Sequence, residues 1–575
     1  KDHRGVEVTF CLAFPDTYSV GMSQTGLHIL YGTLNARPDV AAERAFAPWV
    51  DMAGLLVEEG LPLYSLETFT PLREFDMVGF SLQYEMGYTN VLAMLELAGI
   101  SVLASERGVD EPLIVAGGPG AFNPEPLADF VDVFVPGDGE DAVHRLVDAY
   151  KAARGLARSR EALCHAIAVS GPGFYCPSLY TAGYPRVPRF ADVPAVVEAS
   201  VVHNLDKTFY PTSPIVPYVE TVHDRITLEI MRGCARGCRY CQAGMTRRPV
   251  RARSADTLLE TAEKSYVATG HSEISLASLS TSDYPGFHGL ASRINERFEK
   301  RLVNIAVPSL RVNDQLAAIP ALIGAIRKSG LTVAPEAGTD RLRRVINKDV
   351  TDDDLMSGAE AAFKQGWQRV KLYFMCGLPT ETDEDILAMV SLAERVSALG
   401  KTCRGKAALV SMNIAPFVPK PHTPFQWEPM ITLERIREIR SLVLSRVRSR
   451  CVDVKFHRPE RSFLEGVFSR GDSRLGRVLL EARGRGRWFD AWDEQFDFGS
   501  WMEAFGAAGA DAGAYACRGR GLDEPLPWAH IAAGPSAEFL LRERERALNG
   551  VLTPFCREAG CQGCGLPRCG WRDEV

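Results

Sequence analysis

In this 575-residue chain, two clusters of cysteines have the residue type and the spacing that could do chemistry. They lie in GCARGCRYC, at Cys234, Cys238 and Cys241, and in CREAGCQGCGLPRC, at Cys556, Cys561, Cys564 and Cys569. Thiolates at such short spacing bind iron–sulfur clusters or zinc. The chain opens KDHRGVEVTF, without the basic start and apolar core of a signal peptide. We therefore expect a cytoplasmic protein whose clustered cysteines bind metal in a reducing compartment.

The first cluster, Cys-x3-Cys-x2-Cys, offers three thiolates from one short loop. A cubane 4Fe–4S cluster usually takes four ligands, so three leave one iron open to a small chelating ligand. Zinc in a structural site would need a fourth ligand nearby, and His223 lies too far back, before the intervening strand. The remaining alternative is three buried cysteines without a metal, which does not explain why the motif directly follows an apolar strand.

The second cluster offers four thiolates, with spacings of four, two and four residues. Four thiolates close a zinc site or hold a fully ligated auxiliary 4Fe–4S cluster, so both metals remain open. The glycines between and after these cysteines permit tight wrapping around either metal. Residues 553–572 contain too few apolar side chains to bury a core, so metal binding must supply most of their ordering.

The elements that would position these clusters follow two separate alternations of strands and helices. In residues 1–170 the apolar pattern predicts strands at 6–16, 61–68, 77–83, 113–120 and 131–137. Helices are predicted between them at 21–34, 86–99, 124–130 and 141–153. This alternation predicts an α/β domain with an open, doubly wound (Rossmann-like) parallel sheet, whose ligand sites lie at the carboxyl ends of the strands.

A proline-rich connector, residues 171–220, separates this domain from the second alternation in residues 221–450. Strands are predicted there at 226–234, 273–279, 303–310, 331–338, 369–379 and 408–419, and a helix at 431–447 follows the last. Six strand–helix units predict a partial (β/α)6 barrel of the TIM type. Catalytic groups of such barrels lie where the strands end, and the first cysteine cluster directly follows the first strand.

Residues 451–575 form a predicted C-terminal, α-rich basic region that ends in the four-cysteine tail. Residues 431–490 contain 15 Lys and Arg against 8 Asp and Glu, although the whole chain has a net charge of −7. This local surplus favours an anionic substrate or partner over a merely solvated helix face. No apolar run approaches the length of about 18 residues that a membrane span requires, so we expect no membrane partner.

The segment GCARGCRYCQAG after a first barrel strand resembles the radical S-adenosylmethionine (radical SAM) superfamily. The resemblance implies that Cys234, Cys238 and Cys241 are catalytic and hold a 4Fe–4S cluster whose open iron binds SAM. Tyr240, the aromatic residue before the third cysteine, fits the family pattern. Further contacts to SAM are implied, after the second, fourth and fifth strands, for Ser278, Ser280, Thr281, Glu336, Gly377, Pro379 and Glu381. An electron donor such as flavodoxin or ferredoxin is implied as well.

A doubly wound domain before such a barrel resembles the cobalamin-dependent subgroup, and the chain looks like a subfamily of it with a C-terminal four-cysteine motif. The subgroup has a loop Asp-x-His-x-x-Gly after the first strand. In this chain Asp16, Tyr18 and Gly21 stand at the three named positions of that loop. Tyrosine replaces the histidine that would ligate cobalt, so a corrinoid between this domain and the barrel mouth should be base-off. Gly117 and Gly118 would let the backbone approach the tail of the corrinoid. The alternative is that these glycines only allow a tight turn.

The resemblance implies a radical SAM transferase that makes a 5′-deoxyadenosyl radical and methylates carbon in RNA or another anionic substrate, such as a phosphorylated metabolite. One alternative is rearrangement, cyclisation or methylthiolation without methyl transfer from cobalamin. An alternative of another class is a metal-bearing RNA-binding or assembly protein. Because a radical SAM barrel already handles electrons, we favour iron–sulfur over zinc at the C-terminal cysteines.

Overall fold

The computed structural model describes residues 1–307, 331–566 and 569, and these residues form two compact units. Unit 1 comprises residues 1–224, 467–515 and 521–533, and unit 2 comprises residues 225–466, 516–520 and 534–575. This division differs from the predicted one, because the region predicted as a separate domain, 451–575, contributes to both units.

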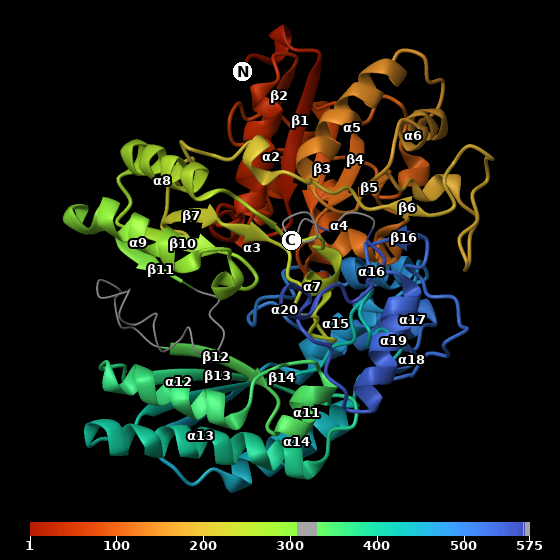
Figure 1. Ribbon diagram of the computed structural model, residues 1–575. Coiled ribbons are helices and arrows are strands. Elements are labelled where there is room, and N and C mark those ends of the chain that lie inside the picture. Colours follow the sequence, from red (N-terminus) through yellow and green to blue (C-terminus); the bar gives the residue numbers. More distant parts are fainter. Residues whose placement is uncertain (308–330, 567–568, 570–575) are drawn as a thin grey trace. The chain divides into compact units, whose positions relative to one another are not determined.

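Unit 1 contains the predicted open sheet, in which all five strands run parallel in the order β2-β1-β3-β4-β5 (Figure 1). The strands are β1 Val8–Phe14, β2 Val40–Phe46, β3 Met77–Ser81, β4 Leu113–Gly117 and β5 Val133–Val135. The strand order reverses between β1 and β3, and doubly wound sheets bind ligands at the carboxyl edge of that point. The loops after β1 and β3 are therefore where a ligand of this unit is expected.

The second strand lies at β2 and not at the predicted residues 61–68. Its sequence, VAAERAF, carries Glu43 and Arg44 in the middle, yet the whole strand is buried. The predicted segment instead supplies the partners of these charges, because Ser65 donates to Glu43 and Arg44 donates to Glu67. Glu43 and Arg44 thus interrupt the hydrophobic pattern of β2. The predicted segment forms only an isolated bridge and a turn, and it supplies the partners of these two charges.

Helices on this sheet form two groups. The first comprises α2 Thr25–Ala36, α5 Gly139–Ala153 and α6 Arg160–Val169, and the second comprises α3 Val50–Glu58, α4 Tyr88–Leu97 and α16 Leu475–Gly484. α17 Phe498–Ala508 packs on α16, and a short α1, Tyr18–Gly21, follows β1. Predicted residues 124–130 form only a 3-10 turn, Glu125–Leu127. The sheet prediction is confirmed, and a segment from beyond residue 466 completes the unit.

Unit 2 contains all six predicted barrel strands, in two described parallel sheets. One sheet has β7 Ile226–Glu229, β10 Glu273–Ala277 and β11 Asn304–Ala306, in the order β11-β10-β7. The other has β12 Leu331–Glu336, β13 Arg369–Cys376, β14 Leu409–Pro416 and β15 Val452–Phe456, in that order. The end of the third predicted strand, 308–310, lies outside the described residues. β15 was not predicted, because its sequence VDVKF sits in a charged stretch.

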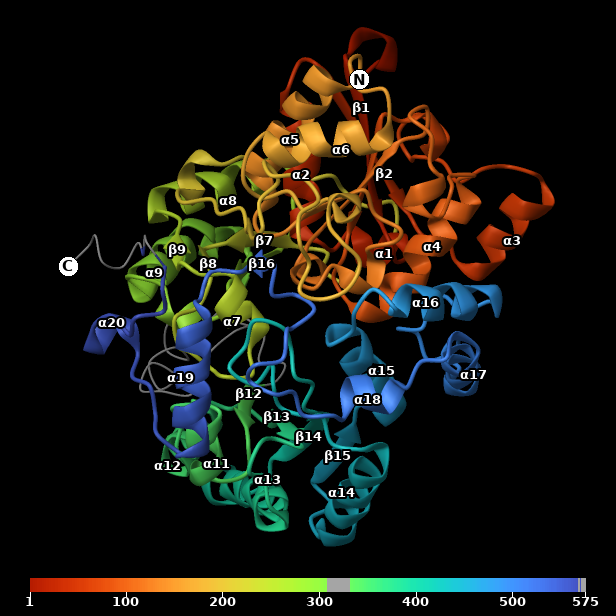
Figure 2. The same ribbon diagram turned by 90° about the vertical axis from the view of Figure 1, so that its right-hand side faces the viewer.

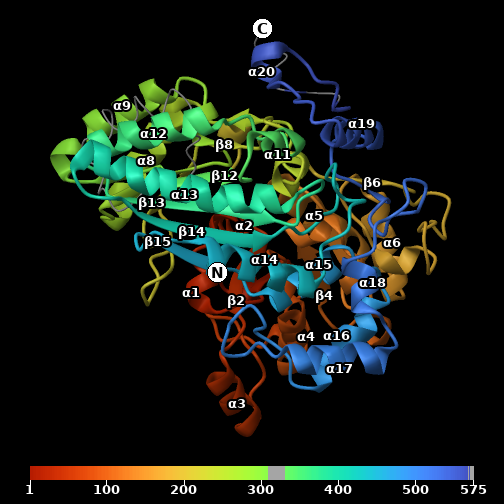
Figure 3. The same ribbon diagram turned by 90° about the horizontal axis from the view of Figure 1, so that it is seen from below.

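The helices of unit 2 follow the strands as the barrel pattern predicts. They are α8 Ala255–Thr269, α9 Phe287–Phe298, α11 Asp340–Val345, α12 Asp352–Lys364, α13 Asp383–Arg404 and α14 Leu433–Arg446. α12 and α13 lie across the four-stranded sheet (Figure 3). Phe363 of α12 packs in one hydrophobic core with Phe374 of β13 and Ile414 of β14. No helix among the described residues is long and apolar enough to cross a membrane.

The end of the chain adds α19 Ala537–Leu548 and α20 Cys556–Ala559 to unit 2 (Figure 2). α15, Pro459–Ser469, contains the point where the chain leaves unit 2, and α18, Ala512–Ala516, the point where it briefly returns. In unit 1, β16 Ile531–Ala532 pairs in parallel with β6 Val197–Glu198 from the proline-rich connector. The C-terminal region is therefore built into both units.

Candidate active site

The first cysteine cluster lies on the loop that follows β7 and the short strand β8, Met231–Arg232, in unit 2. Gly233 opens the loop with φ +88°, and a Cβ there would lie 2.4 Å from the Arg247 carbonyl oxygen. The loop ends at α7, Gln242–Thr246, where the Cys241 sulfur accepts a hydrogen bond from the Gly244 amide. The strand end and the short helix thus fix both ends of the cysteine loop, residues 233–241.

Arg239 anchors the middle of the cysteine loop and is fully buried. Its guanidinium donates to the carbonyl oxygens of Arg344 and Val345 after β12, each at 3.0 Å. It also pairs with Glu543 of α19 at 3.2 Å, and Glu543 is itself buried. Because an unpaired buried charge is costly, this pair holds the loop in one arrangement.

Arg236, between the first two cysteines, points to the loop after β10. It pairs with Asp283, and Asp283 accepts a further hydrogen bond from Ser280 at 2.6 Å. Ser280 and Thr281, both predicted to contact SAM, are buried, and Thr281 hydrogen-bonds to Ser278 at 3.0 Å. The structure therefore gives Ser280 a role in positioning the cysteine loop through Asp283.

Tyr240 and Glu336 were predicted from separate segments, and the structure brings them together. The Tyr240 hydroxyl donates to the Glu336 carboxylate at 2.9 Å, and Lys348 donates to the same oxygen at 3.3 Å. Glu336 ends β12 with φ +68°, a conformation that non-glycine residues seldom adopt. Such local strain is typical of functional sites, so this carboxylate is held in a specific position beside the cysteine loop.

Gly377, Pro379 and Glu381 form the turn after β13. The Gly377 amide donates to one Glu381 oxygen at 2.5 Å, while the other oxygen is buried and has no hydrogen-bond partner among the described residues. Burial raises the pKa of Glu381 to about 8. Gly377 has φ +83°, and a Cβ there would lie 2.7 Å from the Ile431 side chain. Pro379 is partly exposed at the end of this turn.

The donor set of the cysteine loop suits a 4Fe–4S cluster with one open iron. None of its three cysteines is in a disulfide, and all three are partly exposed. Burial, together with the neighbouring Cys238 and Cys234, raises the pKa of Cys241 to about 12. Three thiolates at such proximity need a cationic partner, which a cluster provides. Among the described residues no group of three His, Cys, Asp or Glu side chains has the arrangement of a metal site, so the fit is one of donor type and position.

In unit 1, the loop from Asp16 to Gly21 follows β1 at the point where the strand order reverses. Asp16 accepts hydrogen bonds from the Thr17 amide at 2.7 Å and from the Trp492 indole at 3.0 Å. The Tyr18 hydroxyl accepts one from the Tyr218 amide at 3.1 Å. These residues remain partly exposed. The loop has the predicted position for a ligand of this sheet, but other parts of unit 1 engage its polar groups.

Of the glycines of unit 1 that were predicted to contact cofactor, Gly21 and Gly118 serve tight packing within the chain. A Cβ on Gly21 would lie 2.3 Å from the Phe46 ring, and one on Gly118, which has φ +92°, would lie 2.7 Å from the Leu82 carbonyl oxygen. Gly117 has more room, with its nearest contact at 3.5 Å. Gly21 and Gly118 are therefore required by the fold, whatever the unit binds.

The C-terminal cysteines lie on and after α20 in unit 2. Cys556 begins α20, and burial raises the pKa of its thiol, with Cys564 and Cys569 acting in the same direction. The Gly563 amide donates to the Cys561 sulfur at 3.3 Å. None of the four is in a disulfide.

Five residues of the site were not found by sequence reasoning: Arg236, Arg239, Asp283, Lys348 and Asn347, whose side-chain amide donates to the Arg236 carbonyl oxygen. Each acts through a partner distant in sequence, so no local spacing marks it. Arg236 and Arg239 had one signal, because they alternate with the cysteines of the motif itself.

Comparison with known proteins gives two family matches. The model described as "Radical SAM proteins, N-terminal" matches residues 26–177, and the model described as "Radical SAM superfamily" matches residues 228–393. Together they span more than half of the chain. An uncharacterized protein of Methanocaldococcus jannaschii is 26% identical over 476 residues, which cover 81% of this chain and 90% of the relative.

Solved structures that are similar to the chain include two radical enzymes. The cobalamin-dependent S-adenosylmethionine radical enzyme OxsB, with aqua-cobalamin and S-adenosylmethionine bound, has a TM-score of 0.49 at 12% identity and covers 94% of this chain and 78% of its own. The radical S-adenosylmethionine methyltransferase TsrM from Kitasatospora setae, with cobalamin and a 4Fe–4S cluster bound, has a TM-score of 0.47 at 14% identity and covers 73% and 74%.

The family models, and not these superpositions, identify the chain. The second model begins within β7, includes the whole cysteine loop and extends through β13, so it spans the strands that position Tyr240, Glu336 and Glu381. The chain therefore belongs to the radical SAM superfamily.

Proposed function

We propose that this radical SAM enzyme binds a 4Fe–4S cluster through Cys234, Cys238 and Cys241, and that it methylates carbon in an anionic substrate with cobalamin held by unit 1. The observation that carries the radical step is the cysteine loop after β7, which holds three cysteines outside any disulfide on a backbone that Arg239 fixes. When bound, the cluster supplies the electron that cleaves SAM to a 5′-deoxyadenosyl radical.

The neighbouring residues support a site for SAM beside this loop. Tyr240 and Lys348 hold the Glu336 carboxylate in one orientation. One carboxyl oxygen of Glu381 is buried at the end of the next strand and has no hydrogen-bond partner among the described residues. The Glu336 carboxylate suits the amino and hydroxyl donors of SAM, and the unpaired carboxyl oxygen of Glu381 favours a ligand that pairs with it.

The cobalamin part of the proposal is supported by the architecture of unit 1. Its strand order places the switch point between β1 and β3, and the loop from Asp16 to Gly21 lies there. Tyr18 offers no imidazole, so the residues fit a corrinoid only without histidine ligation from this loop. When bound, methylcobalamin supplies the methyl group. Substrate class stays a prediction from the local positive charge, with RNA or a phosphorylated metabolite as the candidates.

The test is anaerobic turnover of full-length, reconstituted protein with SAM, cobalamin and dithionite, or reduced flavodoxin or ferredoxin as the proposed electron donor. We expect both 5′-deoxyadenosine and S-adenosylhomocysteine, and S-adenosylhomocysteine should disappear when cobalamin is left out. A protein that binds no cobalamin in equilibrium dialysis would contradict the methylation proposal. Absence of 5′-deoxyadenosine with an intact cluster would contradict the radical proposal.

A second candidate function keeps the radical step and omits cobalamin, as in rearrangement, cyclisation or methylthiolation. The observation that favours it is that Asp16 and Tyr18 already have partners in Trp492 and Tyr218. In that case the same assay should give 5′-deoxyadenosine without cobalamin-dependent S-adenosylhomocysteine, so one experiment separates the two functions.

A further inference from the structure

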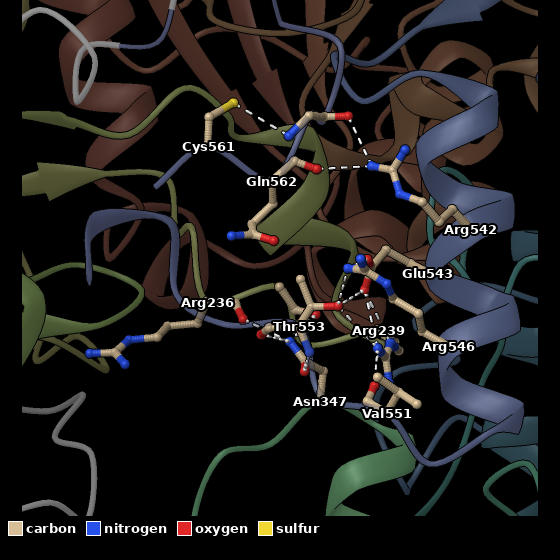
Figure 4. Close-up of polar contacts among 12 residues, drawn as sticks. Arg236, Arg239, Asn347, Arg542, Glu543, Arg546, Val551, Thr553, Cys561 and Gln562 are labelled. Atoms are coloured by element: carbon tan, nitrogen blue, oxygen red, sulfur yellow. Dashed lines mark hydrogen bonds and ion pairs between the residues drawn. The ribbon is translucent and has the colours of Figure 1, made fainter. Parts of the chain in front are cut away.

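Residues 534–566, beyond both family matches, run from α19 to the C-terminal cysteines and contact the cysteine loop (Figure 4). All of these contacts lie within unit 2. They come from three separate points of the segment: Glu543 on α19, Thr553 on the connection after it, and Phe555 at the start of the four-cysteine tail. The segment is thus attached to the loop along most of its length.

The first attachment is a buried polar cluster around Arg239. Its guanidinium donates to Glu543, to the Val551 carbonyl oxygen at 2.7 Å and to the Thr553 hydroxyl at 3.2 Å. Thr553 in turn donates to Glu543 at 2.6 Å. Arg239 and Glu543 are almost fully buried, so every member of the cluster needs its partner.

The second attachment is a clamp formed by Asn347. Its side-chain amide donates to the carbonyl oxygens of Arg236 and Gly237, between the first two cysteines, at 3.1 and 3.2 Å. The same side chain exchanges two hydrogen bonds with the Thr553 backbone, at 2.8 Å from its amide and 3.2 Å to its carbonyl oxygen. One asparagine therefore fixes the backbone of the cysteine loop to a residue three positions before Cys556.

The third attachment reaches the tail itself. The Arg236 guanidinium lies 3.8 Å from the centre of the Phe555 ring, a cation–π contact next to Cys556. Arg557, on the other side of Cys556, donates to the Asp283 carbonyl oxygen at 3.2 Å. Arg236 and Asp283 pair with each other, so the same ion pair that supports the cysteine loop also supports the residues flanking Cys556.

The tail has the local features of a thiolate metal site. The Gly563 amide donates to the Cys561 sulfur, as amides two residues after a metal-bound cysteine do in Cys-x2-Cys turns. Gly560, Gly563 and Gly565 all have positive φ, from +65° to +92°, which lets the chain wrap tightly. The Ser536 amide binds the Cys564 carbonyl oxygen at 2.9 Å, and Arg542 binds that of Gln562 at the same distance.

We propose that Cys556, Cys561, Cys564 and Cys569 bind a second thiophilic metal centre, fixed beside the cysteine loop by Arg239, Asn347 and Arg236. Two centres share this ligand chemistry: an auxiliary 4Fe–4S cluster, which we favour, and zinc. Binding requires the loss of a proton from each ligating thiol, so metal uptake releases protons. The proposal that these four cysteines bind a metal does not depend on the proposed function. Only the statement that the neighbouring centre is a SAM-binding 4Fe–4S cluster depends on it.

The experiment compares metal and sulfide content of full-length protein, purified and reconstituted without oxygen, with that of two variants. The first variant is Cys561→Ala/Cys564→Ala, and the matched control is Cys403→Ala/Cys451→Ala, two partly buried cysteines of unit 2 outside both clusters. With two cubanes we expect iron to fall from about eight to about four per chain in the first variant only. With zinc, we expect one zinc to be lost while about four iron remain.

Unchanged metal content in the first variant would overturn the proposal. A misfolded variant is recognised by loss of the first cluster as well, and then Cys234→Ala/Cys238→Ala/Cys241→Ala decides: it should retain the second metal, and complete metal loss there would also overturn the proposal. Failure of the proposed function looks different, because it leaves metal content intact and removes SAM cleavage. Placement beside the loop is tested in protein with the first cluster removed, where loss of the tail metal should increase amide exchange in residues 233–241.

Discussion

Two loops of the molecule each follow the first strand of a parallel sheet, and they differ in which of their groups have hydrogen-bond partners. In the loop after β1, the polar side chains of Asp16 and Tyr18 already have partners within unit 1. In the cysteine loop after β7, the partners instead bind Arg236, Arg239 and the backbone, and no disulfide uses the cysteines.

The difference shows how a loop is kept ready for a ligand. Rigidity in the cysteine loop comes largely from Arg236 and Arg239, which lie between the cysteines. In the loop after β1, order and ligand binding compete for the same side chains. A ligand there must either accept the existing hydrogen bonds or replace them, and replacement costs about 1 kcal/mol for each ordinary bond.

The largest expected effect comes from removing single thiols from the cysteine loop. Each of Cys234→Ala, Cys238→Ala and Cys241→Ala should abolish the cluster and reduce 5′-deoxyadenosine formation to below detection, because two thiolates do not hold a cubane. Asp16→Asn in the other loop should leave both unchanged. Iron content and product analysis by mass spectrometry check this, and a cluster retained in any single cysteine variant would contradict the assignment.

The next effect comes from breaking the support of that loop. Glu543→Gln leaves Arg239 buried without its counter-charge and should lower the free energy of unfolding by about 3 kcal/mol. The control is Glu545→Gln, two residues further along α19 and exposed, which should change it little. Chemical denaturation followed by circular dichroism measures both. Equal stability of the two variants would show that the buried pair does not hold the loop.

A smaller effect should follow in the loop after β1. Trp492→Phe removes the donor to Asp16 while keeping an aromatic ring, and should destabilise the protein by about 1 kcal/mol. Because this loop does not support the cysteine loop, formation of 5′-deoxyadenosine should stay within twofold. Thermal unfolding and turnover measured on the same sample check both statements, and a large loss of SAM cleavage would show that the two loops are not independent.

The smallest effect concerns pH. Burial raises the pKa of Glu381 to about 8, whereas an unfolded glutamate titrates near about 4.3. The folded state thus retains a proton that the unfolded state loses, so this contribution to stability is complete below about pH 4.3 and is lost as pH rises to 8. Its slope is at most about 1.4 kcal/mol per pH unit.

Glu381→Gln should remove this slope, and exposed Glu384→Gln in the first turn of α13 should keep it. Denaturation of each protein at several pH values between about 5 and 8 measures the difference. Parallel pH curves for wild type and Glu381→Gln would contradict the raised pKa.

Sequence alone predicted the parts of this molecule that depend on local pattern. The apolar strands of unit 2 and the cysteine spacing are of this kind, and all six predicted strands formed. β2 and β15 were missed because charged residues interrupt their pattern, and in β2 the charges are satisfied by residues about 20 positions away. Local spacing cannot reveal such pairs.

The residues of the candidate site also divide into those that a local motif predicts and those that a distant partner defines. Cys234, Tyr240 and Glu336 were predicted from motifs, and the hydrogen bond between the last two then joined them in space. Arg239, Asn347 and Asp283 were not predicted, because each is defined by a partner in a distant segment. Ser280 also donates to Asp283, a partner that its motif did not predict, and its expected contact to SAM stays a prediction.

The discontinuous make-up of unit 1 has a consequence for how the chain is made. Buried groups of its early part are satisfied by late residues: Asn90 accepts from the Phe489 amide, and Asn123 donates to the carbonyl oxygens of Ser469 and Gly471. At about 5–20 residues per second, a ribosome needs on the order of tens of seconds to advance from Asp224 to Ala533. Throughout that interval unit 1 stays incomplete, with core-facing polar groups unpaired, while residues 225–466 of unit 2 are translated. Chaperone occupancy on nascent chains should therefore persist on the N-terminal half until residue 533 has left the exit tunnel.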